Sequence, residues 1–192
     1  TGAKATTTTS FAQGNLAGTT QPLDLAIQGN GFFGVRDQTG QLLLSRAGNF
    51  HLSENKQLVN SEGYPVAMTT NVPTPQWPDA QQIAIDASGQ LTTEENGQTR
   101  VLGQLTLYQP TNTENITPVG NQLYRAGDQA LLTSQTNPAA FGSVLQGQLE
   151  QSTVDLATSM TDLLTTQRAY GLNTKAMQTA DEMWSVINRF TD

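Results

Sequence analysis

Few side chains of this 192-residue chain can perform acid–base or nucleophilic chemistry. His51 is the only histidine, and cysteine is absent. A Ser-His-Asp site needs a histidine that is held by a carboxylate and faces an activated serine, and no serine here lies in a nucleophile-elbow motif. A single histidine without cysteine also falls short of the ligand set of a zinc site. We therefore expect His51 to be an exposed strand residue, and we expect no catalytic, cofactor-binding or metal-binding residues.

The remaining polar clusters do not change this expectation. The acidic pairs Glu94–Glu95 and Asp181–Glu182 lack the apolar surroundings that general acid catalysis needs. The turns at residues 37–40 and 86–89 are rich in aspartate, but they lack the alternating ligands and final glutamate of an EF-hand. The Gly-Asn-Gly sequence at residues 29–31 is too short to cradle a phosphate and follows no βα pattern. An enzymatic function is not indicated.

The composition instead favours a subunit that is covered by neighbours. Charged residues make up only 13% of the chain, the net charge is -7, and the sequence pI is about 4.5. The nine basic residues are scattered, which argues against a nucleic-acid partner. There is no apolar run of the length that crosses a membrane and no secretory leader pattern. Burying a surface of neutral polar groups against another protein costs less desolvation free energy than burying a charged surface.

Short strands separated by turn residues occupy the middle of the chain. Residues 23–28 alternate apolar and polar side chains, residues 29–31 form a tight turn, and residues 32–35 form the return strand. Polar turns at residues 37–40, 53–56 and 86–89 are each followed by Gln-Leu, which opens the next strand.

The rest of the middle region reads mostly as loop. Residues 71–79 hold three prolines around Trp77 and are expected to form an ordered loop. The last clear strand is residues 103–108, residues 110–127 are a polar connection, and residues 133–143 are a further loop. Residues 144–149 are expected to return as a strand.

The C-terminal stretch, residues 152–190, contains no proline, and its first residues match a capping box, in which Ser152 and Asp155 are three residues apart. From Leu156 to Trp184 a series of residues then follows in steps of four and three, the period of a supercoiled seam, with polar residues at Gln167, Thr174 and Asp181. An ordinary amphipathic helix packed on its own domain is the alternative. The residues that we expect to form an assembly interface are Leu156, Met160, Leu163, Gln167, Tyr170, Met177, Trp184 and Ile187.

We therefore predict a mainly β fold with a long C-terminal α-helix, that is, a meandering or Greek-key β-domain plus a coiled-coil-type helix. The predicted divisions are an extended threonine-rich linking segment (1–20), a β-rich outer domain (21–143) and a C-terminal helical assembly segment (144–192).

Two groups of motifs resemble the flagellar rod and hook protein family. Near the N-terminus they are PLDLAIQGNGFF at residues 22–33, SRAGNF at 45–50 and LVNSEGYPV at 58–66. Near the C-terminus they are GQLEQSTVD at residues 147–155, MTDLLTTQRAY at 160–170 and TADEMW at 179–184. The resemblance covers nearly the whole chain, and its length is closest to the distal-rod members and their Gram-positive hook-basal-body paralogues. Gly171 departs from the family, in which a better helix former is commoner at that position.

The resemblance implies a non-catalytic subunit of the flagellar axial rod, which polymerises helically around the export channel and connects basal body and hook. Its implied partners are copies of itself, other rod and hook proteins, and the flagellar type III export apparatus, with no nucleic acid, no membrane insertion and no cofactor. The implied location is the basal body in the cell envelope, reached without a cleaved signal peptide. Because family members carry an N-terminal helix that pairs with the C-terminal one, we also expect that this chain is truncated at its N-terminus.

Two alternatives stay open from the sequence. One is a proximal rod or hook subunit. The other is a secreted β-rich adhesin or glycan-binding module, in which Trp77, Tyr64 and Tyr108 would line a sugar site.

Overall fold

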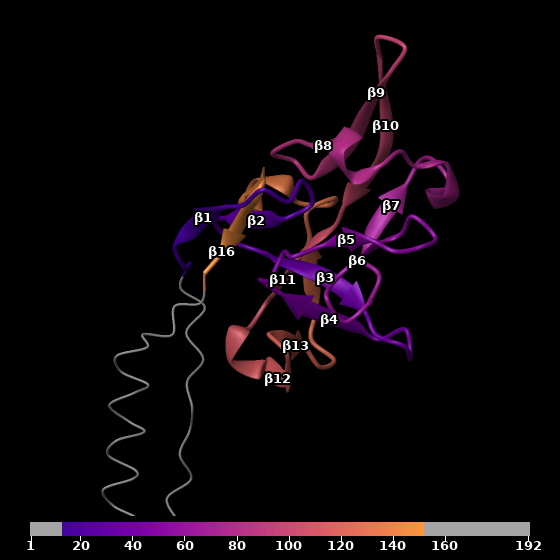
Figure 1. Ribbon diagram of the computed structural model, residues 1–192. Coiled ribbons are helices and arrows are strands. Elements are labelled where there is room, and N and C mark those ends of the chain that lie inside the picture. Colours follow the sequence, from indigo (N-terminus) through magenta and orange to yellow (C-terminus); the bar gives the residue numbers. More distant parts are fainter. Residues whose placement is uncertain (1–12, 152–192) are drawn as a thin grey trace, which may run out of the picture. The chain divides into compact units, whose positions relative to one another are not determined.

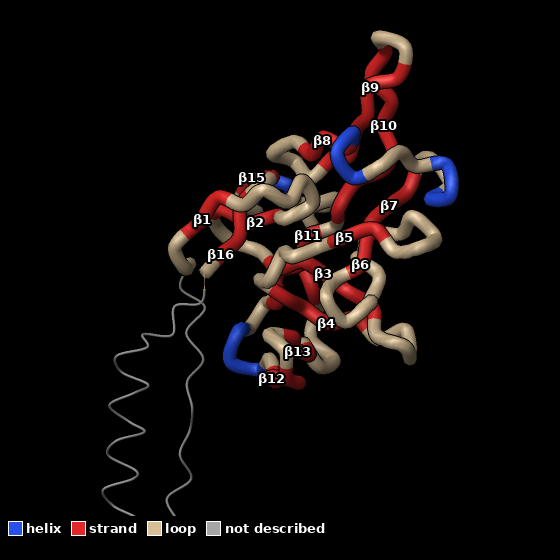
Figure 2. Tube along the Cα trace, viewed as in Figure 1, coloured by secondary structure: helices blue, strands red, loops and turns tan. Residues whose placement is uncertain are grey.

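The computed structural model describes residues 13–151, and every strand pairing in this range is antiparallel (Figures 1 and 2). The chain divides into two units, 1–152 and 153–192, and the described residues belong to the first.

The largest element is a six-stranded sheet, whose side chains alternate between its two faces. Phe33 and Val35 point to one face and are buried in the main core, whereas Phe32 belongs to a separate cluster on the other face. In spatial order the strands are β12 (Thr117–Gly120), β13 (Leu123–Arg125), β4 (Leu42–Ser45), β3 (Phe32–Arg36), β11 (Leu107–Pro110) and β14 (Leu131–Thr133).

A four-stranded sheet lies toward the other end of the described residues (Figure 1). Its strands, in spatial order, are β7 (Met68–Thr70), β10 (Gln98–Leu105), β9 (Gln90–Glu95) and β8 (Ile83–Ile85). The β9–β10 hairpin projects beyond the rest of the described chain (Figure 1). Its turn is Asn96-Gly97, with φ angles of 53° and 75°, as a type I′ hairpin turn requires.

Three two-stranded pairs complete the strands: β1 (Leu16–Gly18) with β16 (Gln148–Glu150), β2 (Leu25–Gln28) with β15 (Ser143–Gln146), and β5 (His51–Leu52) with β6 (Leu58–Val59). The helical turns of the described residues are four 3₁₀ segments: η1 (Thr74–Gln76), η2 (Ala80–Gln82), η3 (Thr113–Asn115) and η4 (Pro138–Ala140).

One main core joins the sheets. Leu25, Ile27 and Val35 have no measurable exposure, and Phe33 meets Phe50 edge to face with ring centroids 5.0 Å apart. Burying each such side chain contributes about 1.5–3 kcal/mol relative to leaving it in water. The core therefore draws on residues from both sheets and from the β2–β15 pair.

The three predicted hairpin turns are confirmed. Residues 37–40 connect β3 with β4, residues 53–56 connect β5 with β6, and residues 86–89 connect β8 with β9. In each case the aspartate or serine that opens the turn accepts hydrogen bonds from backbone N–H groups further along it.

The predicted hairpin across residues 29–31 is wrong. Strands exist on both sides, but β2 pairs with β15 and β3 pairs with β4 and β11. A Gly-Asn-Gly turn shows that the chain bends, and it does not say which strand will pair with the edge of β2. That partner comes from residues 143–146, where Gly142 N–H also donates to the Asn30 carbonyl at 2.8 Å. The polar connection 110–127 likewise contains β12 and β13.

The predicted fold class must also be corrected. The described residues are mostly strand, as expected, but they contain no α-helix, so a long C-terminal α-helix with a coiled-coil seam is not part of the fold that the structure supports. Residues 143–146 and 148–150, at the start of the predicted helical segment, extend the β-structure. The periodicity beyond Ser152 falls outside the described residues. A four-three spacing is only a pattern of residue types, and three of its positions hold the polar residues Gln167, Thr174 and Asp181.

Candidate assembly site

Both ends of the described chain lie together. Strands β1 and β16 run antiparallel, with Leu16 opposite Glu150, and the Gln151 N–H donates to the Asn15 carbonyl at 2.8 Å. The chain therefore enters and leaves the β-structure at one place, so any segment beyond either end starts from the same small region (Figure 1).

Arg46 and Glu150 form a largely buried ion pair at this place. The Arg46 Nη2 lies 2.9 Å from the Glu150 Oε2, and the side chains are 17% and 10% exposed. Arg46 Nε donates to the same oxygen at 3.0 Å, and Glu150 Oε1 accepts the Gly14 N–H at 2.8 Å. Because one carboxylate receives both the guanidinium and a backbone N–H of the incoming chain, this pair holds the first and last described segments together.

Arg46 also closes the loop between β2 and β3. Its Nη1 donates to the carbonyls of Gly29 and Gly31 at 2.9 and 2.7 Å, and its Nη2 donates to the Ile27 carbonyl at 3.4 Å. The guanidinium carbon lies 5.9 Å from the centre of the Phe32 ring, within the range of a cation–π contact. These contacts give hydrogen-bond donors to the carbonyls of the β2–β3 loop. The strand before this loop, β2, pairs with β15 and not with β3.

Gly48 allows the backbone that follows Arg46 to lie directly against Leu25 of β2. The Leu25 N–H donates to the Gly48 carbonyl at 2.9 Å, and a Cβ at residue 48 would collide with the Leu25 carbonyl. Only glycine allows this approach without a shift of one chain. The SRAGNF motif thus joins a buried cation to a tight backbone contact two residues later.

A second set of hydrogen bonds fixes the junction between β15 and β16. Thr19 Oγ1 donates to Asp24 Oδ2 at 2.6 Å, and the Gly147 N–H donates to the Asp24 carbonyl at 2.8 Å. Gln146 Nε2 donates to the carbonyls of Pro22 and Ile83, and its Oε1 accepts the Ile85 N–H. The motifs at residues 22–33, 45–50 and 147–150 therefore converge on one node, which we call the terminal clamp: Asp24, Gly29, Gly31, Arg46, Gly48 and Glu150.

An open cavity of about 370 Å³ adjoins the terminal clamp. Gln13 lies at its edge, where its Oε1 accepts the Gly29 N–H and its Nε2 donates to the Ile27 carbonyl. Its lining residues are Gln13, Gly29, Asn30, Gly31, Phe32, Arg46, Gln109 and Thr113. The one charged group among these lining residues, Arg46, is already paired with Glu150.

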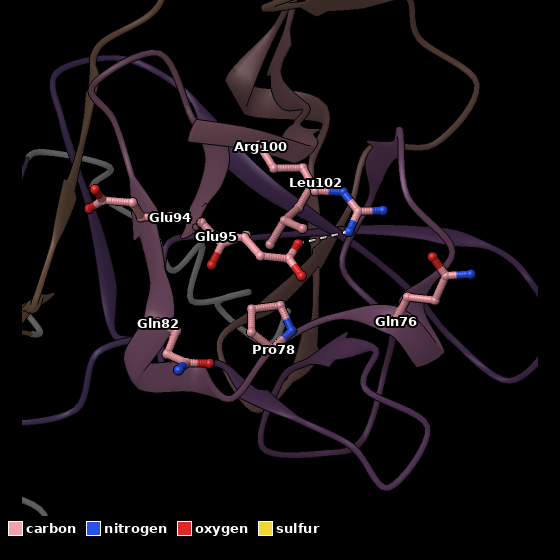
Figure 3. A pocket seen from close by; sticks show the side chains of 8 residues that line it. Gln76, Pro78, Gln82, Glu94, Glu95, Arg100 and Leu102 are labelled. Atoms are coloured by element: carbon pink, nitrogen blue, oxygen red, sulfur yellow. Dashed lines mark hydrogen bonds and ion pairs between the residues drawn. The ribbon is translucent and has the colours of Figure 1, made fainter. Parts of the chain in front are cut away.

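A second cavity, of about 350 Å³, flanks the β9–β10 hairpin. Figure 3 shows Glu95 and Arg100 pointing toward one another over it, with a separation of 3.3 Å between Arg100 Nη1 and Glu95 Oε2. These side chains are 63% and 45% exposed, so the pair is solvated and contributes little to stability. Glu94 and Glu95 are the last two residues of β9, next to the Asn96-Gly97 turn.

The other residues singled out in the sequence lie apart from one another. His51 is an exposed residue of β5, as predicted. Trp77 is 3% exposed and its Nε1–H donates to the Val72 carbonyl at 3.0 Å, so its ring is not available to a sugar. Tyr64 packs against the main core and Tyr108 against the second cluster, so the three aromatic residues form no common site. All eight predicted interface residues, from Leu156 to Ile187, lie outside the described residues.

Two further properties concern residues 13–151 only. No group of three or more His, Asp or Glu side chains there is arranged to hold a metal ion. No helix there is long and apolar enough to cross a membrane.

Arg46 and Glu150 both lie within the family motifs, but the motifs by themselves indicate no role for either residue. A signal was available: in a chain with only 13% charged residues, Arg46 is the one charged residue of SRAGNF, and Glu150 is one of two in GQLEQSTVD. The pairing itself was not predictable, because the two residues are 104 positions apart.

Comparisons with known proteins match both parts of the chain. The family model described as "Flagellar hook protein FlgE/F/G D1 domain" matches residues 26–93, and the one described as "Flagellar basal body rod FlgEFG protein C-terminal" matches residues 145–190. The chain is 38% identical to the flagellar basal-body rod protein FlgG of Agrobacterium fabrum, over 92% of this chain and 68% of that protein.

Other relatives carry related names. The FlgG of Buchnera aphidicola subsp. Acyrthosiphon pisum is 34% identical, again over 92% of this chain and 68% of the relative. The flagellar hook-basal body complex protein FlhP of Bacillus subtilis is 29% identical with the same coverage.

Proposed function

This chain belongs to the flagellar hook and basal-body rod family, and we propose that it is a structural subunit of the bacterial flagellar rod that assembles with copies of itself and with other axial proteins in the basal body. The observation that carries the proposal is the 38% identity to a rod protein over 92% of the chain. A mechanical role is supported by the terminal clamp, which holds both ends of the described chain with a buried ion pair.

The proposal also covers the position of the subunit within the flagellum and the apparatus that exports it. We place the subunit in the distal rod, because two FlgG proteins are matched at 38% and 34% identity, against 29% for the hook-basal body complex protein FlhP. A proximal rod or hook position is the alternative within the family. Export by the flagellar type III apparatus without a cleaved signal peptide follows from family membership and is part of the proposal. The glycan-binding alternative has little support, because Trp77 is buried.

Contacts between subunits are proposed to involve the C-terminal residues Leu156, Met160, Leu163, Gln167, Tyr170, Met177, Trp184 and Ile187. In an open-ended helical assembly, one patch of each copy meets a different patch of the next. Leu163→Asp and Tyr170→Asp place a charge in such a contact. Both variants should keep the β-structure folded and fail to enter the rod, whereas the control Tyr170→Phe should assemble. Normal motility of both aspartate variants would contradict the assignment.

The function is tested in a strain deleted for the full-length gene. Swimming is scored first, and isolated basal bodies are then imaged by electron microscopy. Truncated rods without hooks, restored by the wild-type gene, would support a rod subunit and show where growth stops. Complete hooks and filaments in the deletion strain would overturn the proposal.

A further inference from the structure

The dipeptide Asn-Gly occurs twice in this chain, at residues 30–31 and 96–97. It favours a spontaneous reaction, in which the backbone nitrogen of the glycine attacks the side-chain amide carbon of the asparagine. Glycine promotes this attack because it has no side chain to shield the nitrogen and its backbone rotates freely. The reaction consumes water and needs no enzyme. Both asparagines are exposed, so exposure alone does not distinguish the two sites.

Hydrogen bonds hold the backbone around Asn30. For the attack, the peptide unit between Asn30 and Gly31 must rotate until its nitrogen faces the side-chain carbon. The carbonyl of this same unit accepts the Gly142 N–H at 2.8 Å. The carbonyls of Gly29 and Gly31, on either side, accept from Arg46 at 2.9 and 2.7 Å. Rotation would therefore break the first of these bonds and displace the acceptors of the other two.

The space around Gly31 is also restricted. Gly31 is buried, and a Cβ built on it would lie 3.0 Å from Cδ1 of the Phe141 ring. A Cβ on Gly29 would lie 3.1 Å from the Gly142 Cα. Residues 141–142 therefore pack directly on this turn, and they leave little room for the cyclic imide that the attack would form.

The peptide unit between Asn96 and Gly97 lies in a much more open place. These are the two turn residues of the β9–β10 hairpin, and the last pair of the strand ladder is Glu95 with Gln98. In such a turn the central peptide unit lies outside the ladder. Both turn residues are exposed, and a Cβ on Gly97 would meet nothing within 4 Å. The hairpin also projects beyond the rest of the described chain (Figure 1). This unit can therefore rotate without the loss of a ladder hydrogen bond.

We propose that Asn96 is a site of spontaneous deamidation and that the terminal clamp protects Asn30 from the same reaction. The Gly97 nitrogen loses its proton to a base in solution and bonds to Cγ of Asn96, and the side-chain nitrogen leaves as ammonia. The resulting cyclic imide takes up water at either of its two carbonyl carbons. Ring opening restores the N–H and gives aspartate or isoaspartate, so one water is consumed for each ammonia released.

Deamidation changes both the charge and the shape of the hairpin tip. It adds a carboxylate beside Glu94 and Glu95, where Arg100 is already paired with Glu95. Isoaspartate also lengthens the backbone of the turn by one carbon, which a two-residue type I′ turn does not accommodate. This modification goes beyond the proposed role as a rod subunit and does not depend on it.

Peptide mapping by mass spectrometry tests the inference in the purified full-length protein, which is incubated at neutral and mildly alkaline pH in water enriched in heavy oxygen. Asn96 should convert to aspartate and isoaspartate that carry the heavy oxygen. Conversion should be faster at the higher pH, because the attacking nitrogen must lose a proton. Asn30 should convert at least about tenfold more slowly, which corresponds to about 1.4 kcal/mol of additional free energy for local opening. Equal rates at the two sites, or an Asn96 that stays unmodified, would overturn the inference.

The same protein in urea is the matched control, because unfolding removes the structural difference between the two turns. There the two rates should approach one another. A gap in urea as large as that in the folded protein would assign the difference to local sequence and overturn the protective role of the terminal clamp.

A variant tests the clamp directly. Arg46→Lys weakens the hold on the Gly29 and Gly31 carbonyls. Conversion of Asn30 should then become several-fold faster, whereas that of Asn96 should stay unchanged. An unchanged rate at Asn30 in the folded variant would contradict the protection by Arg46. The comparison with urea decides the question if this variant does not fold.

Discussion

The Arg46 guanidinium lies 2.9 Å from the Glu150 carboxylate, although 104 residues separate the two along the chain. Both side chains are largely buried, and together they contact the backbone at Gly14, Gly29 and Gly31. Removing one member of a buried pair costs more than the pair contributes, because the other charge is left without a partner. This pair is therefore the most vulnerable point at which the terminal segments join the β-structure.

Arg46→Ala should lower the free energy of unfolding by about 3–5 kcal/mol, because it leaves the Glu150 carboxylate and three backbone carbonyls without their donor. Arg46→Lys should lower the free energy of unfolding by a smaller amount, since an ammonium keeps the charge beside Glu150. Some loss should remain, because the ammonium cannot reproduce the several directed hydrogen bonds of the guanidinium. Urea denaturation followed by circular dichroism gives both values. The matched control is Arg36→Ala, an exposed arginine without an ion pair to a described carboxylate, which should stay within about 0.5 kcal/mol of wild type. Equal losses at positions 36 and 46 would contradict the role of the terminal clamp.

Gly48→Ala should destabilise the protein by about 1–3 kcal/mol, because the added methyl group forces apart two chains that are in backbone contact. A Cβ at this position would meet the Leu25 carbonyl. This atom belongs to the backbone and not to a flexible side chain that could move away. Gly18→Ala is the control, since a Cβ there has nothing within 4 Å. The midpoints of thermal unfolding should separate the two variants, and a Gly48→Ala protein as stable as Gly18→Ala would refute the packing argument.

Thr39→Ala should raise the pKa of the Asp37 carboxyl back toward its ordinary value of 3.8. The Thr39 hydroxyl, which donates to Asp37 Oδ1 at 2.6 Å, is the main cause that lowers this pKa, with the N–H groups of Gln41 and Thr39 adding to it. A carboxyl with a lowered folded-state pKa stabilises the fold above its unfolded-state pKa, and this contribution is lost as the pH falls through the folded-state value. The β3–β4 turn should therefore loosen below about pH 4. An NMR titration of the Asp37 side chain measures the shift, and an unchanged pKa in Thr39→Ala would disprove the assignment of its cause.

Trp77→Phe should cost about 1–3 kcal/mol of unfolding free energy, because the buried Val72 carbonyl loses the only donor that the tryptophan supplies. The variant also leaves a small void in the core. Chemical denaturation with a far-UV readout avoids the change in fluorescence. The neighbouring exposed residue offers a control, Gln76→Ala, which should be nearly neutral. A neutral Trp77→Phe would mean that the tryptophan is not part of the core.

The local features were readable from the sequence. Asp37, Ser53 and Asp86 each open a turn and use their own side chains to hold it, so those hairpins depend on residues within five positions of one another. The exposed position of His51 followed from the lack of partners for it in the composition. The strand at residues 144–149 was expected from its apolar residues, although its partner strand was not.

The pairing of distant strands was not readable in the same way. Gly29 and Gly31 signalled a turn correctly, yet β2 takes residues 143–146 as its partner, because a turn residue fixes local φ angles and leaves the sheet edge open to any strand that fits. The four-three spacing after Ser152 is also insufficient by itself. Such a pattern says which residues would share a face of a helix, but it does not establish that the segment is a helix.

The sequence by itself determined the family, the largely β character of the described residues and the turns that connect neighbouring strands, because these depend on residue types a few positions apart. Only the tertiary structure decided that Arg46 meets Glu150, that β2 pairs with β15 and that the six-stranded sheet keeps a partly exposed apolar face. These features depend on which distant surfaces bury the most apolar area and satisfy the most polar groups together. Which surfaces pair therefore depends on residues throughout the described chain and not on any one motif.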